Sequence, residues 1–135
     1  QMNTAAVQAS GSYLLFLHAD SRLADPHLLT TAVVALRAAE LEQPWAAGHF
    51  RLHFLRTDRQ HELAYRFLEA KTGLNRPGTT NGDQGLLLSR SFFDRIGGFD
   101  QSLPFLEDQR IAIPKELMQA WGVPEGMFVS VRPAP

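Results

Sequence analysis

Short apolar runs along the chain predict β-strands. The run Tyr13–Leu17 is continuously apolar, as in strands that are buried on both faces of a parallel sheet. From Trp45 to Leu55 apolar and polar residues alternate, which predicts a strand with one polar face. The same reasoning predicts two further strands over residues 85–89 and 127–131.

Apolar residues at helical spacing predict helices between these strands. Asp25 precedes one helix and Ser91 another, and we expect both side chains to cap them. Leu63, Phe67 and Leu68 recur at helical spacing, so we expect them on the inner side of a third helix. Strands that alternate with helices indicate an α/β fold. The predicted helices span residues 2–9, 27–42, 59–72, 92–96 and 115–121.

Length and composition narrow the possible functions. A chain of 135 residues is expected to form a single domain over residues 1–135. Its 13 basic and 14 acidic residues give a net charge of −1, which leaves no basic excess for binding nucleic acid. The absence of cysteine excludes disulfide scaffolds and thiol catalysis. The longest apolar run is far shorter than the roughly 20 residues of a membrane-spanning helix. We therefore expect no transmembrane segment, and a location in the cytoplasm or at the inner membrane surface.

The first candidate site follows the strand over Tyr13–Leu17. Asp20 comes just past the end of this strand, where ligands bind in open α/β sheets, and a carboxylate suits a divalent cation that bridges phosphates. Alternatively, Asp20 caps the following turn. His18 shares a face with Asp20 and is either a second ligand or a polar filler. His49 and His53 would lie about 13 Å apart on a strand, so we expect neither to bind a metal.

Two later polar segments could also carry chemistry. In the segment Gly82-Asp83-Gln84-Gly85 the glycines permit a tight turn and the close approach of a ligand. Its carboxylate and amide could bind sugar hydroxyl groups, or the carboxylate could bond its own backbone. Glu107 and Asp108 are adjacent carboxylates. They could serve as a general base and its neighbour, or stabilise an exposed helix start.

The order of these segments along the chain resembles that of family 2 glycosyltransferases. The similarity is closest to a small bacterial subgroup whose metal motif is spelled His-Ala-Asp, and it covers residues 1–112. The tail over residues 113–135 diverges from the family. The segments that carry the resemblance are Gln1-Met2-Asn3, residues 14–23, Gly82-Asp83-Gln84-Gly85, Arg90, Phe93, Gly97-Gly98-Phe99 and Glu107-Asp108.

The resemblance implies a glycosyltransferase A fold, with a mostly parallel or mixed sheet and flanking helices. It also implies that a sugar passes from a nucleotide-sugar donor to an acceptor with inversion, helped by Mn²⁺ or Mg²⁺. Asp20 then takes the metal-binding place, and His18 stands where the usual motif has its first Asp. Asp108 becomes the general base, with Glu107 beside it. The implied substrate-binding residues are Gly82, Asp83, Gln84 and Arg90.

The sequence departs from the family at its start. Family members begin with an apolar strand, a Pro/Asn loop and a second strand that hold the nucleotide base, and no counterpart is present here. We therefore expect an incomplete glycosyltransferase A fold, either active as a transferase or retained as a non-catalytic binding and assembly module. A nucleotidyltransferase would need a Gly-rich phosphate loop with Arg or Lys, which the sequence lacks. Without its usual neighbour, the strand Tyr13–Leu17 is expected at a sheet edge, where pairing with a second copy gives a homodimer.

Overall fold

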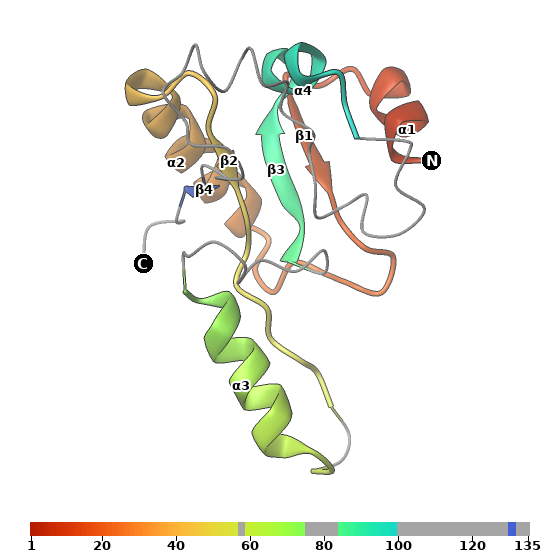
Figure 1. Cartoon of the computed structure of the whole chain (residues 1–135), viewed down its shortest axis with the longest axis vertical. Helices are drawn as coiled ribbons and strands as arrows, with labels where there is room; N and C mark the ends of the chain where they lie inside the picture. The colour runs from red at the N-terminus through yellow and green to blue at the C-terminus, as the bar shows by residue number, and fades with distance from the viewer. Residues whose placement is uncertain (57–58, 75–83, 100–129, 132–135) are drawn as a thin grey trace.

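A computed structural model of the chain describes residues 1–56, 59–74, 84–99 and 130–131. The described part is a small mixed α/β unit (Figure 1). The predictions for residues 2–9, 13–17, 27–42 and 85–89 are confirmed, each with one end shifted by one residue. The helices are α1 (Met2–Gln8), α2 (Leu28–Glu42), α3 (Glu62–Thr72) and α4 (Arg90–Ile96). The strands are β1 (Tyr13–Phe16), β2 (Ala47–Gly48), β3 (Leu86–Ser89) and β4 (Ser130–Val131).

The four strands form one mixed sheet in the order β1-β3-β2-β4. β3 runs antiparallel to both of its neighbours, and β4 pairs parallel to β2. The expectation of a mostly parallel sheet is therefore wrong, whereas a mixed sheet is confirmed. The error has a physical reason. A continuous apolar run indicates that a strand is covered on both faces, but it does not indicate the direction of the neighbouring strand.

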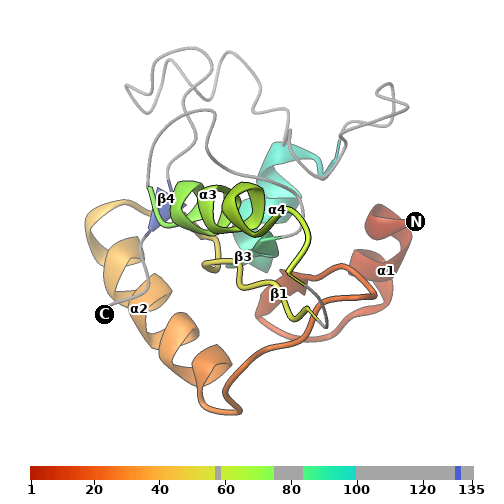
Figure 2. The same ribbon diagram turned by 90° about the horizontal axis from the view of Figure 1, so that it is seen from below.

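Helices cover the sheet on both faces (Figure 2). On one face Leu86 and Leu88 of β3 pack with Phe92 and Ile96 of α4. On the other face the core contains Leu87 of β3, Leu36 of α2 and Phe50, among others. Successive residues of β3 thus enter opposite cores, as the pleat of a strand requires, and all four of its residues are buried.

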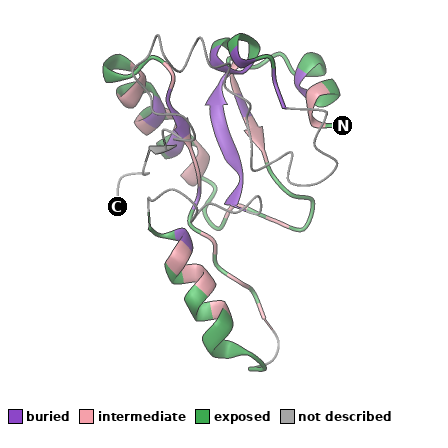
Figure 3. Cartoon of the chain, viewed as in Figure 1, coloured by how far each residue is buried: buried purple, intermediate pink, exposed green. Residues whose placement is uncertain are grey.

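The predicted strand over residues 45–55 is reduced to β2, and the chain beyond it is extended, with no strand partner among the described residues (Figure 3). The predicted alternation of faces is confirmed, because Phe50 is buried and Arg51 exposed. Side chains of α3 supply acceptors for the backbone here: Leu52 N donates to the hydroxyl of Thr72 at 3.1 Å, and Phe54 N donates to Glu69 at 2.8 Å. Side chains of α3 therefore accept backbone hydrogen bonds that a neighbouring strand would otherwise accept.

The helix α3 extends beyond the sheet (Figure 1) and turns a polar face toward this extended segment. Leu63 and Phe67, which we expected on the inner side, are 83% and 68% exposed, whereas Leu68 is half-buried. The prediction was wrong for the first two because the hydrogen bonds to the extended backbone and the edge-to-face contact of Tyr65 with Phe54 turn another side of α3 toward this segment. The consequence is an apolar row that faces outward.

The helix starts also differ from the predicted caps. Ser89, not Ser91, is the N-cap of α4, and its hydroxyl accepts from Phe92 N. His27 is the N-cap residue of α2, and Asp25 accepts from His27 N at 2.8 Å just before it. Both differences leave the predicted helices in place. The predicted helix at residues 115–121 lies outside the described residues, as does most of the predicted strand at 127–131.

Replacing Gly98 with alanine is expected to lower the free energy of unfolding by about 3–4 kcal/mol. Gly98 has φ of +80°, and an added Cβ would lie 2.7 Å from Oδ1 of Asn3. That side chain exchanges two hydrogen bonds with the backbone of Phe99, each 2.9 Å long, and the new methyl group would displace it. The loss should be visible in urea denaturation.

The matched control for this variant is Gly97→Ala. Gly97 has nearly the same φ, +78°, but an added Cβ there meets no atom within 4 Å. It should therefore cost only the left-handed conformation, about 1–2 kcal/mol. Equal losses at Gly97 and Gly98 would contradict the role assigned to Asn3.

Candidate functional site

The antiparallel pairing of β1 and β3 brings two of the predicted motifs together. Phe16 pairs with Leu86, so the chain leaving β1 lies beside the chain entering β3. An added Cβ on Gly85 would lie 3.2 Å from Cδ1 of Leu17 and 3.3 Å from the carbonyl oxygen of Phe16. The chain that leads into the His-Ala-Asp turn and the end of the Gly-Asp-Gln-Gly segment are therefore neighbours at one end of the sheet. The φ of Gly85, +68°, is one that glycine adopts readily.

Asp20 lies on the exposed turn that follows β1. Ser21 N donates to the carbonyl oxygen of His18 at 3.0 Å, which closes the turn, and His18 is exposed on it too. Among the described residues no group of three or more His, Cys, Asp or Glu side chains gathers to hold a metal. A cation such as Mg²⁺ that bridges nucleotide phosphates commonly takes only one or two protein carboxylates. An exposed Asp20 fits that kind of site.

Gln84, predicted to contact substrate, is buried and only 3% exposed. Its Nε2 donates to the carbonyl oxygens of Phe50 at 2.9 Å and Thr72 at 3.1 Å. Its backbone carbonyl oxygen accepts from Phe50 N at 3.0 Å. The residue thus joins the extended segment, the end of α3 and the entry to β3. Its predicted neighbours Gly82 and Asp83 lie outside the described residues.

Arg90, the other predicted substrate-binding residue that is described, is bound to the backbone that connects α1 to β1. Its guanidinium donates to the carbonyl oxygens of Ala6, Ala9 and Gly11 at 3.1, 2.6 and 2.9 Å. A cation at this place also suits the partial negative charge at a helix C-terminus. These contacts give Arg90 a structural task at the end of α1. The predicted catalytic residues Glu107 and Asp108 lie outside the described residues.

The structure adds His49 to the same end of the sheet. Its Nδ1 lies 3.2 Å from the carbonyl oxygen of Gly85. Burial lowers the pKa of this imidazole, and the Gly85 carbonyl opposes that shift in part. His53 has a different partner, since its Nδ1 lies 3.1 Å from Oε1 of Glu69. The two histidines thus have different partners, and spacing along the chain could not indicate that one of them adjoins the motif at Gly85.

The lowered pKa of His49 predicts a loss of stability in acid. Because its folded pKa lies below the unfolded value of about 6.5, the neutral imidazole is favoured by folding. The stabilisation that the neutral imidazole gives the folded state is fully present above a pH of about 6.5 and falls as the pH drops below it. The urea midpoint should therefore decrease on acidification, and less steeply in His49→Gln. The same pH dependence in both proteins would contradict this.

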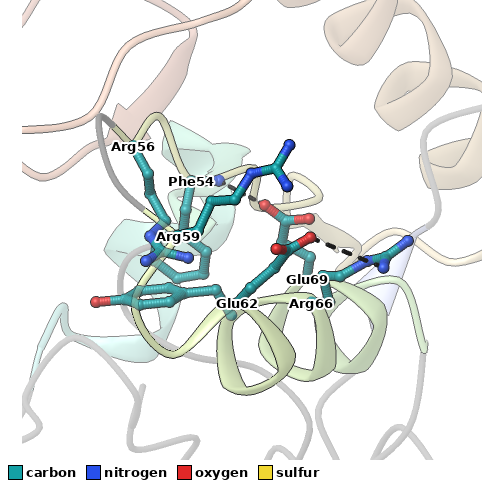
Figure 4. A pocket seen from close by; sticks show the side chains of 7 residues that line it. Phe54, Arg56, Arg59, Glu62, Arg66 and Glu69 are labelled. Carbon is teal, nitrogen blue, oxygen red and sulfur yellow. Dashed lines mark hydrogen bonds and ion pairs between the residues drawn. The ribbon is translucent and has the colours of Figure 1, made fainter.

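A hollow lies beside α3, between this helix and the segment before it (Figure 4). It has a volume of about 220 Å³. The guanidinium of Arg56 lies 4.1 Å from the centre of the Tyr65 ring and donates to the carbonyl oxygen of Gln60. The lining residues are Phe54, Arg56, Arg59, Glu62, Tyr65, Arg66 and Glu69. Both basic and acidic side chains line the hollow, so its charge does not indicate one class of ligand.

Comparison of the chain with protein-family models, curated proteins and solved structures finds no match. Within the ranges that the structure describes, no helix is both long and apolar enough to cross a membrane.

Proposed function

We propose that this chain is the catalytic part of a metal-dependent family 2 glycosyltransferase with a glycosyltransferase A fold. One observation carries the proposal beyond the sequence motifs. The β1–β3 register brings Leu17, which leads into the turn with Asp20, beside Gly85, although the two motifs are far apart in sequence. A transferase needs both near one bound donor. The proposed location is the cytoplasm or the inner membrane surface.

In this proposal each motif has a chemical task. Asp20 would hold the divalent ion at the diphosphate of the donor, and such an ion neutralises charge that develops on the leaving group. Asp108 takes the proton from the acceptor hydroxyl, with Glu107 beside it. The acceptor oxygen forms a bond to the anomeric carbon as the bond to the diphosphate breaks. The electron pair of that bond leaves with the nucleoside diphosphate, and the anomeric centre inverts.

The contacts of Gln84 refine its role in this proposal. Since its amide nitrogen donates to two backbone oxygens, we assign Gln84 to holding the segment that carries Asp83. Asp83 is then the group of this segment that would accept from sugar hydroxyl groups. Arg90 supports the fold through α1, at the opposite end of β3 from Gly85.

Calorimetric titration with nucleoside diphosphates tests the proposal. UDP, GDP, CDP and TDP should each be titrated with and without Mn²⁺, because the residues do not identify the base. We expect at least one to bind, and to bind more tightly with Mn²⁺. Failure of all four in the presence of Mn²⁺ would contradict a donor site on this chain.

The second candidate function is a non-catalytic binding or assembly module. The observation that favours it is the use of Gln84 and Arg90 within the fold, since two predicted substrate-binding side chains are occupied by backbone groups. A protein that self-associates but binds no nucleoside diphosphate would support this alternative over the transferase.

We also propose a homodimer, and predict that light scattering at micromolar concentration gives twice the chain mass of 15.1 kDa. β1 is an edge strand of the sheet in the described residues, and an uncovered edge pairs readily with another chain. Leu15→Lys places a charge on this strand and should break the dimer. Val34→Lys adds the same charge to an exposed position of α2 and should not. A monomer of 15.1 kDa in the unchanged protein would contradict the prediction.

A further inference from the structure

An apolar row lies on the outer side of α3 and continues past its end. We call it the α3 stripe, and it consists of Leu63, Phe67 and Leu74, which are 83%, 68% and 45% exposed. Their spacing of four and seven residues aligns them on one side of a helix. Leu74 follows the last turn, where its backbone N donates to the carbonyl oxygen of Lys71 at 3.0 Å.

Basic side chains border the α3 stripe, and acidic ones are turned away from it. At about 100° per residue, Arg66 and Lys71 fall on opposite sides of the row. Glu62 and Glu69 fall on the far side of the helix, where Glu69 accepts from Phe54 N. Arg66 is largely exposed and its guanidinium is 3.9 Å from Glu62, a separation at which an exposed pair contributes little.

The charge of this region differs from that of the whole chain. Residues 51–71 contain five basic and three acidic residues, whereas the net charge of the chain is −1. The described basic residues of this region lie on α3 or on the segment before it. Whatever covers the α3 stripe therefore meets a locally positive surface.

A second copy of the chain does not suit this surface. If two α3 stripes packed antiparallel, Arg66 of one copy would lie on the same side of the contact as Arg66 of the other, and Lys71 on the same side as Lys71. If they packed parallel, Arg66 of one copy would lie on the same side as Lys71 of the other. Either arrangement places like charges beside a buried apolar contact, which is unfavourable. The charge pattern favours an anionic partner.

We propose that the α3 stripe binds the surface of an anionic lipid bilayer. Leu63 and Phe67 enter the boundary between headgroups and acyl chains, and α3 lies in the plane of the membrane. Arg66 and the half-buried Lys71 provide the cations for the lipid phosphates. This surface is distinct from the sheet end that carries Asp20, and it does not depend on transferase activity.

Flotation with vesicles tests the apolar part of the proposal. The probes are vesicles of phosphatidylcholine alone and of phosphatidylcholine mixed equally with phosphatidylglycerol. The unchanged protein should float with the mixed vesicles only. The double variant Leu63→Ser/Phe67→Ser should bind them about tenfold more weakly or worse. Its matched control is Val34→Ser/Leu41→Ser, which removes two side chains of α2 that are 62% and 89% exposed and should bind normally.

A charge variant completes the test. Arg66→Gln and Lys71→Gln should each weaken binding to mixed vesicles by about fivefold, and added salt should weaken it further. Equal binding to both kinds of vesicle, or an equal loss in the α2 control, would overturn the proposal. So would self-association that Leu63→Ser/Phe67→Ser abolishes, because the occupant of the stripe would then be a second copy.

Discussion

Replacing Asp108 with asparagine is expected to lower turnover by about 100-fold or more in catalytically active protein that carries this segment. The acceptor hydroxyl is a weak nucleophile, and the amide that replaces the carboxylate cannot take its proton. Binding of the donor should stay near normal, because the proposed metal contact is at Asp20. Turnover at saturating donor, together with donor affinity from calorimetry, separates these two effects.

Glu107→Gln is the comparison for this variant. It removes the same charge one residue earlier in the chain but leaves the proposed base in place, so its effect on turnover should be smaller. Unfolding curves of both variants should match that of the unchanged protein. Normal turnover in Asp108→Asn, or a protein that simply unfolds, would refute the role as a base.

The second large effect is expected from Asp20→Asn. The change keeps the size of the side chain but removes the charge that holds a divalent ion. Manganese-dependent binding of a nucleoside diphosphate should fall by about 100-fold or more. Because Asp20 is on an exposed turn, the free energy of unfolding should change little. The measurement is the affinity with and without Mn²⁺.

Asp25→Asn is the matched control for this second variant. Asp25 is also an exposed aspartate, and its Oδ1 accepts from His27 N, a task that an asparagine oxygen can perform. It should keep manganese-dependent binding. If Asp20→Asn binds the nucleotide and Mn²⁺ as well as the unchanged protein does, Asp20 is not the metal contact.

The sequence predicts the individual segments of the candidate site, but it does not predict which residues these segments contact. The residue types at Asp20 and in the segment 82–85 by themselves suggest a metal and a sugar. That the chain before Asp20 lies beside Gly85 depends on the pairing of β1 with β3. The contacts of Gln84 and Arg90 join residues 12 to 84 positions apart, and the order of side chains alone does not reveal such partners. For the same reason, spacing gives no sign that His49 adjoins Gly85.

The local pattern of apolar and polar residues was sufficient to predict the elements that pack with their apolar residues inward. The run Tyr13–Leu17 predicted β1, and the spacing along residues 27–42 predicted α2, since each pattern reports which positions avoid water. The same pattern predicted the buried side of Phe50 correctly. It failed for Leu63 and Phe67, because α3 is oriented by the hydrogen bonds of Thr72 and others to an extended backbone.

The positions of most described helices and strands, and the inward side of most apolar residues, thus follow from the order of amino acids alone. These are local properties, set by backbone geometry and by the cost of exposing apolar surface. Strand direction, the partner of the extended segment and the neighbours of Gly85 depend on contacts between segments far apart in the chain. Such contacts are selected by the packing of the whole sheet and its helices, which gives the antiparallel β3 and the outward α3 stripe.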